Sequence, residues 1–142
     1  YSAFTIVQVI YSGTIFISQM ETPDVLLLRR GKPVELNSSC KTVQGRRIRS
    51  KISSVRDVDT MVAVSNGFLR TGAERELKNG WGLEQVSKYM VNAFTPRVTA
   101  ETLVHLLLSA GDSLSRGRSK DFSALVFRMH RSNRQDVSEN GL

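Results

Sequence analysis

The chain has 142 residues, of which 40% are hydrophobic and 23% charged, with a formal net charge of +7 at pH 7. That length supports one domain with a hydrophobic core but is too short for two domains of ordinary size. No apolar run approaches the roughly 20 residues that span a bilayer, so neither a membrane helix nor a membrane partner is expected. The single cysteine, Cys40, excludes an internal disulfide and predicts a reducing, cytoplasmic compartment.

Residues 4–36 predict two successive β-hairpins. Phe4–Ile10 is rich in β-branched residues, and after a short glycine-containing turn the strand pattern resumes over Thr14–Ser18. Val25–Arg29 and Val34–Leu36 form a second pair of strand patterns around a Gly-Lys-Pro turn. Two such hairpins in succession predict an antiparallel sheet.

Residues 37–55 are polar, basic and contain a glycine, and they predict a loop with one edge strand, anchored by Ile48 and Ile52. The following run, Met61–Val64, consists of four apolar residues bounded by turn residues. Such a run is typical of a short strand that is buried on both faces. We expect this strand to be the central one of the sheet.

Ser65, Asn66 and Gly67 follow this strand directly and form a candidate functional site. Short polar side chains at the carboxyl end of a strand project from a rigid edge, where chemistry can take place. A glycine there can adopt a positive φ or let a ligand approach closely. The simpler interpretation is that Asn-Gly only turns the chain.

Two helices are predicted next. The first has apolar residues at helical spacing, namely Leu83, Val86, Met90 and Ala93. Phe94-Thr95-Pro96 ends this pattern, and Trp81 is expected to be a packing anchor under the helix start. Thr99 is the predicted N-cap of the second helix, with Glu101 in its first turn. The apolar face of that helix comprises Leu103, Leu106, Leu107 and Ala110.

We expect Gly111 to end the second helix, residues 112–120 to form a loop, and Ala124–Met129 to form the last strand. The polar, aperiodic composition beyond residue 131 predicts a disordered tail over residues 132–142. Strands, two helices and a strand follow one another without βαβ alternation. This order predicts an α+β fold in which antiparallel β-sheets are packed by helices.

The signatures of common catalytic sites are absent from the sequence: it has no glycine-rich phosphate loop, no histidine pair at metal-binding spacing and no nucleophile elbow. His105 and His130 are expected to face solvent, and Cys40 has no partner that would make it a catalytic thiol. The basic residues are dispersed in loops without interleaved aromatic residues, which argues against a nucleic-acid partner. A basic nucleic-acid-binding module is kept as an alternative from another functional class.

Two stretches around the candidate site, Met61–Gly72 and Leu77–Val86, resemble a known family. They are similar to the apolar strand, the Ser-Asp-Gly motif and the Gly-Trp helix start of metal-dependent protein phosphatases (PPM, 2C type). The resemblance is closest to the bacterial branch of the stage II sporulation protein E type. Pro23–Leu36 resembles the family's Leu-Leu-Arg-x-Gly hairpin, and Leu114–Met129 is similar to its closing Asp-Asp loop and strand.

The resemblance implies an α-β-β-α sandwich, of which residues 1–131 would be the C-terminal portion. It also implies hydrolysis of phosphoserine and phosphothreonine with two Mg²⁺ or Mn²⁺ ions held by carboxylates. Hard cations prefer oxygen ligands, and two of them lower the pKa of a bridging water. The implied partner is a phosphoprotein or a regulatory protein.

The chain departs from the family pattern where the metal ligands would be. Asn66 occupies the position of the aspartate in the Ser-Asp-Gly motif. In the closing loop, one alignment places Lys120 at a metal-binding position, and the alternative alignment makes Asp121 the ligand. The family's first half, with its N-terminal metal aspartate, precedes the position that matches Tyr1.

These departures predict weak or absent metal binding, and no residue is assigned as catalytic. We expect an incomplete or degenerate phosphatase-like domain that acts as a binding or regulatory module. The alternative is part of an active Mg²⁺- or Mn²⁺-dependent phosphatase whose first half is missing from this chain. Half of a sandwich would expose a sheet edge and apolar surface, which favours a homo-oligomer.

Overall fold

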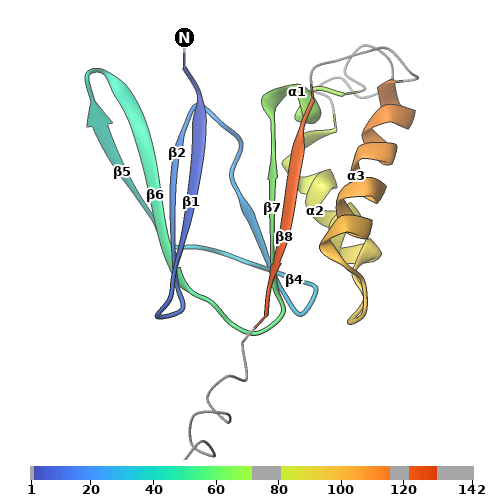
Figure 1. Ribbon diagram of the computed structural model, residues 1–142. Helices are drawn as coiled ribbons and strands as arrows, with labels where there is room; N and C mark the ends of the chain where they lie inside the picture. Colours follow the sequence, from blue (N-terminus) through green and yellow to red (C-terminus); the bar gives the residue numbers. More distant parts are fainter. Residues whose placement is uncertain (1, 72–80, 116–121, 131–142) are drawn as a thin grey trace, which may run out of the picture.

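Two antiparallel sheets of four strands each lie face to face, and helices cover the far side of one of them (Figure 1). The computed structural model describes residues 2–71, 81–115 and 122–130. We call the sheet that packs against the helices the central sheet and the other one the outer sheet. This arrangement confirms the expected fold class, antiparallel β-sheets packed by helices.

The outer sheet has the strand order β1-β2-β6-β5. Its strands are β1 (Phe4–Ile10), β2 (Thr14–Met20), β5 (Ser38–Val43) and β6 (Arg46–Ser54). β1 and β2 form the predicted first hairpin, in which Ile10 lies opposite Thr14. Gly13 in its turn has a φ of +90°, a conformation that glycine adopts without steric cost.

The central sheet has the strand order β4-β3-β7-β8. Its strands are β3 (Leu26–Arg29), β4 (Lys32–Val34), β7 (Asp59–Val64) and β8 (Ala124–Met129). β3 and β4 form the second predicted hairpin, although β4 begins at Lys32, inside the expected turn, and ends at Val34. β7 pairs with β3 on one side and β8 on the other. The predicted central strand and the predicted last strand are therefore confirmed.

Three helices pack on the central sheet: α1 (Asn66–Leu69), α2 (Gly82–Ala93) and α3 (Ala100–Ser115). α2 buries Val86 and Met90 and ends at its C-cap, Phe94, as the apolar spacing predicts. The hydroxyl of Thr99 accepts a hydrogen bond of 3.1 Å from the backbone N–H of Thr102, so Thr99 caps α3 as expected.

The core has two parts, one on each side of the central sheet. Met61 in β7 packs with Ile15 and Ile17 of the outer sheet. Its neighbour Val62 faces the helices and joins a cluster that includes Phe68, Val86, Met90, Leu103 and Leu107. Because alternate residues of β7 serve the two clusters, the strand is buried on both faces, as its continuous apolar run predicts.

An edge strand is present in residues 37–55 as expected, namely β5, but the expected loop is wrong, because β5 and β6 form a regular hairpin there. All six residues of β5 are exposed, so its pairing rests on backbone hydrogen bonds and leaves no apolar alternation in the sequence. Ile52 is not a core anchor, since it is 59% exposed, whereas Ile48 is half-buried.

The predicted end of the second helix is also wrong, because α3 continues through Gly111 to Ser115. A Cβ atom at Gly111 would lie 3.1 Å from the Phe68 ring, so glycine is present here for close packing rather than as a helix stop. The buried stripe of α3 follows i, i+4 spacing through Leu103, Leu107 and Gly111. Leu106 lies off this stripe and is 40% exposed.

In the described ranges, no helix is both long and apolar enough to cross a bilayer. The expected disordered tail, residues 132–142, and residues 116–120 of the expected loop lie outside these ranges.

Candidate functional site

Ser65 connects the end of β7 to the first helix and to the start of β8. Its hydroxyl accepts hydrogen bonds from the backbone N–H groups of Phe68 (3.3 Å) and Ser123 (3.0 Å). Its own N–H donates to the Ser123 carbonyl at 3.0 Å. Two lone pairs of the hydroxyl are thus used by backbone donors, which makes Ser65 a structural cap rather than a nucleophile.

Asn66 opens α1, so the Asn-Gly pair starts a helix instead of a simple turn, and Gly67 is helical. The side-chain amide of Asn66 donates a hydrogen bond of 2.9 Å to the backbone carbonyl of Glu21. Glu21 belongs to the link between β2 and β3 and has a φ of +54°. Asn66 therefore ties the helix start to a link 45 residues earlier in the chain.

The link between β2 and β3 is fixed from inside by Gln19, a fully buried polar residue. Its amide nitrogen donates to the Thr5 hydroxyl and the Thr22 hydroxyl, both at 3.2 Å, and to the Pro23 carbonyl. Gln19 is not among the functional residues predicted from the sequence. Its signal is a polar residue that continues the buried positions of β2 after Ile15 and Ile17.

Asp24, in the same link, is neutralised by two cations from β6. Arg49 lies 2.5 Å and Lys51 3.1 Å from its Oδ1 atom. Arg49 also donates to the Thr22 carbonyl. Because its carboxylate already pairs with two cations, Asp24 is a poor candidate for a metal ligand.

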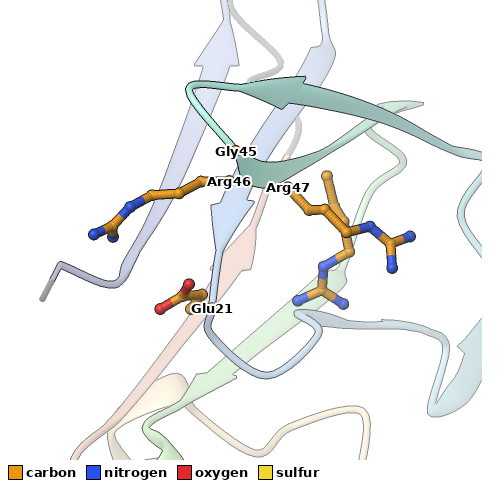
Figure 2. A pocket seen from close by; sticks show the side chains of 5 residues that line it. Glu21, Gly45, Arg46 and Arg47 are labelled. Carbon is orange, nitrogen blue, oxygen red and sulfur yellow. The ribbon is translucent and has the colours of Figure 1, made fainter.

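A cavity of about 510 Å³ opens beside this link, lined by Glu21, Gly45, Arg46, Arg47 and Arg49 (Figure 2). Figure 2 shows the side chains of Arg46 and Arg47 extending in opposite directions from β6. The Nε of Arg47 contacts the Cys40 thiol sulfur at 3.4 Å, and this contact raises the pKa of the guanidinium. The lining is basic, which suits an anionic group better than a cation.

The other residues named from the sequence are placed as follows. Lys120 and Asp121 lie outside the described residues, so their alternative assignments stay predictions. His105 and His130 are exposed, and His105 lies 3.9 Å from Glu101 on its own helix. Cys40 is exposed as well, with Arg47 as a contact that the sequence did not reveal.

The residues described here do not fit a binuclear metal centre. Within residues 2–71, 81–115 and 122–130, no three His, Cys, Asp or Glu side chains come together as a ligand group. Asn66 directs its amide nitrogen, which cannot ligate a cation, at Glu21. No catalytic step through a metal is therefore derived for these residues.

A second buried charge, Asp59, lies at the other end of β7. Arg29 in β3 contacts both of its carboxylate oxygens, at 3.0 and 2.9 Å, and the Arg56 N–H donates to it at 2.8 Å. The hydrogen bond to Asp59 raises the pKa of Arg29, although burial opposes this shift. The pair joins two strands, and both carboxylate oxygens of Asp59 already accept hydrogen bonds, so we assign it a structural role.

Comparison with known proteins finds likeness in structure only. No family model matches the sequence, and no curated protein matches it. The phosphatase domain of the cell fate determinant SpoIIE from Bacillus subtilis, presoaked with Mn, matches 97% of this chain with a TM-score of 0.76 and 12% identity. A second structure of that domain matches 94% with a TM-score of 0.74 and 13% identity.

The matched region is part of a larger domain, since this chain spans 60% of the length of each SpoIIE chain. At 12 to 13% identity, the likeness concerns the fold. It agrees with the resemblance found around Met61–Gly72 and with the two facing antiparallel sheets. The chain therefore has the fold of the PPM-type phosphatase domain of SpoIIE.

Proposed function

We propose that this chain is a phosphatase-like domain that recognises a phosphoprotein or a regulatory protein without hydrolysing phosphate by itself. Likeness to the SpoIIE phosphatase domain supports the phosphatase-like part of the proposal. The hydrogen bond from Asn66 to Glu21 supports the loss of hydrolysis. The lone exposed thiol of Cys40 fits a reducing compartment, so we place the protein in the cytoplasm.

The proposed loss of hydrolysis depends on Asn66, because the surroundings of its side chain suit an amide and not a carboxylate. An aspartate in the same position would turn a carboxylate oxygen toward the Glu21 carbonyl, and both atoms are acceptors. Asparagine also lacks the negative charge that attracts a divalent ion. At about 4 Å and an effective dielectric near 20, that attraction is roughly 8 kcal/mol before hydration is counted.

A second candidate is an active Mg²⁺- or Mn²⁺-dependent phosphatase that takes its remaining carboxylates from outside these 142 residues. One observation favours it: the chain spans 60% of the SpoIIE phosphatase domain, and the first structure of that domain compared above was presoaked with Mn. This candidate needs Asp121 to act as a ligand while Asn66 does not.

The experiment is isothermal titration of the purified chain with MnCl₂, together with a phosphoserine-peptide hydrolysis assay. We expect wild type to give no binding heat and no hydrolysis. An Asn66→Asp, Lys120→Asp double variant tests whether the two family positions form a site. Asn92→Asp, on the exposed surface of α2, adds a negative charge away from the candidate site. This variant should show neither Mn²⁺ binding heat nor hydrolysis.

The proposal is supported, and the lost site located, if the double variant binds Mn²⁺ while wild type gives no binding heat. Micromolar Mn²⁺ binding or Mn²⁺-dependent hydrolysis by wild type overturns it in favour of the second candidate. Equal gain of binding in Asn92→Asp would show that added charge alone is responsible.

A further inference from the structure

Arg128, near the end of β8, carries a guanidinium group that is only partly used. Its Nη1 group donates to the backbone carbonyl of Val98, and its Cζ atom lies 5.2 Å from the centroid of the Phe94 ring. Its Nε and Nη2 groups are buried and have no hydrogen-bond partner in the described part of the chain. Because a guanidinium keeps its positive charge at physiological pH, a charged edge is enclosed here without an acceptor.

Arg29 in the same sheet shows what this edge of a guanidinium binds. Its Nε and Nη2 groups donate to the two carboxylate oxygens of Asp59, at 3.0 and 2.9 Å. Two parallel N–H groups match the two oxygens of a carboxylate, so this pairing is the favoured bidentate geometry. Arg128 presents the same two groups, and within residues 2–71, 81–115 and 122–130 no oxygen accepts from them.

Thr60 adds a second unpartnered polar group beside Arg128. The two residues lie directly opposite each other in the register of β7 and β8, so their side chains share one face of the sheet. Cβ atoms of such opposite residues are about 4.5–5.5 Å apart. Thr60 is fully buried, and its hydroxyl has no hydrogen-bond partner among the described residues. Since buried polar groups are nearly always hydrogen-bonded, these two neighbours point to an occupant that bonds to both.

The described chain itself encloses Arg128 and Thr60. Phe94 is the C-cap of α2, and Val98 belongs to the link between α2 and α3. A Cβ atom at Gly31 would lie 2.6 Å from the Phe94 ring, so the turn between β3 and β4 packs against the same ring. The helices lie on the side of the central sheet that faces away from the outer sheet (Figure 1). The enclosure therefore does not depend on what covers the outer sheet.

We propose that Arg128 and Thr60 bind the carboxylate group of a small organic acid. One guanidinium balances one carboxylate, whereas a phosphate dianion would leave a negative charge buried without a partner. A water molecule offers an acceptor but no charge, so it would leave the guanidinium unpaired. The acid has to be small, because the unpartnered atoms are closed off from solvent and the Phe94 ring has to move aside to admit it.

This site is separate from the candidate functional site at the other end of β7. Thr60 is five residues from Ser65, or roughly 17 Å at about 3.3 Å per residue. The inference concerns a further ligand and stands apart from the proposed function.

The probe is sodium acetate, titrated into the full chain at constant ionic strength with sodium chloride as the reference salt. NMR spectra of the ¹⁵N-labelled chain follow the Nε–H signal of Arg128 and the backbone amides of Thr60 and Val98. We expect saturable shifts of these signals with acetate and none with chloride. Inorganic phosphate is the second anion and should bind at least about tenfold more weakly, because its extra charge has no partner in the site.

Arg128→Lys keeps the positive charge but loses the paired N–H groups. It should therefore weaken acetate binding by about tenfold or more. Arg97→Lys is the matched control, because Arg97 is exposed and lies next to Val98 in the same link. It should bind acetate like wild type, and circular dichroism confirms that each variant is folded.

Thr60→Val distinguishes a ligand site from a structural role. Valine keeps the branched shape of threonine without the hydroxyl, so the acetate-free variant should unfold at a higher temperature than wild type, since an unpartnered buried group is gone. The same variant should bind acetate about fivefold more weakly, because it loses a hydrogen bond to the ligand. A purely structural threonine would not combine higher stability with weaker binding.

Three results would overturn the inference. The first is the absence of a saturable shift with acetate in folded wild type, which would mean that water alone occupies the site. The second is acetate binding that Arg128→Lys and Arg97→Lys change equally or, if Arg128→Lys does not fold, binding that Thr60→Val leaves unchanged. The third is phosphate binding as tight as acetate binding, because the occupant would then be another class of anion.

Discussion

Phe68 shows how single residues decide the packing around the candidate site. Its ring is fully buried and lies 5.5 Å from the Trp81 ring and 5.4 Å from the Phe122 ring, centroid to centroid. Gly111 of α3 also faces the Phe68 ring, and an added methyl group there would lie 3.1 Å from the ring, so the ring would have to move slightly to accept it. Trp81 is thus the packing anchor that the sequence predicts. Gly111 packs closely against the Phe68 ring, a role that the sequence alone did not indicate.

At Gly111, replacement by alanine should lower the free energy of unfolding by about 1 kcal/mol. Alanine favours a helix over glycine by about 1 kcal/mol, but overpacking costs about 1–3 kcal/mol when the neighbour cannot move. Phe68 is held by two other rings, so we expect the overpacking to exceed the gain in propensity. Urea unfolding measures the difference.

Ser109→Ala on the exposed side of α3 is the control and should be neutral or slightly stabilising. A Gly111→Ala variant that is more stable than wild type would show that the Phe68 ring can shift.

Among the elements, β3 and β7 are joined by a charged pair as well as by backbone pairing. Leu28 lies opposite Thr60 in the register, and the Arg29–Asp59 pair sits next to it. Asp59 is fully buried, while Arg29 is 21% exposed in its side chain. The pair therefore differs from Glu84–Lys88 on α2, where both side chains are well exposed.

Arg29→Met should destabilise the protein by about 2–3 kcal/mol, because it leaves the Asp59 carboxylate buried with one backbone donor. The residual exposure of Arg29 puts the expected loss at the lower end for a broken buried pair. Lys88→Met removes the partner of an exposed pair and should give no measurable change. Chemical denaturation of both variants tests this, and equal losses would contradict a special role for Asp59.

On the scale of the whole molecule, the two sheets are protected to different degrees. The central sheet is covered on both sides, by the outer sheet and by the helices. The outer sheet is covered on one side in the described residues, and its edge strand β5 is exposed at all six positions. Local opening is expected where buried apolar contacts are few.

Native-state hydrogen exchange should therefore find β7 amides the slowest and β5 amides much faster, close to local fraying. β3, which also belongs to the central sheet, should follow β7. Amides of β5 that exchange as slowly as those of β7 would contradict this and would indicate that another chain covers the outer sheet in solution.

The sequence by itself determined most elements of this protein. Period-two patterns found the first two hairpins, a continuous apolar run found the strand over Met61–Val64, and period-3.6 patterns found the helices that bury Val86 and Leu103. Those patterns work because each element has a buried side that is occupied mainly by apolar residues. The resemblance around Ser65-Asn66-Gly67 predicted the phosphatase-like fold that the structural comparison confirms.

Only the tertiary structure decided the rest. The β5–β6 hairpin has no buried face to mark it, and Gly111 continues a helix because a ring from another element fills its place. The role of Asn66 depends on a carbonyl 45 residues away. Such features depend on contacts between residues that are distant in the sequence, and local propensity carries no information about those contacts.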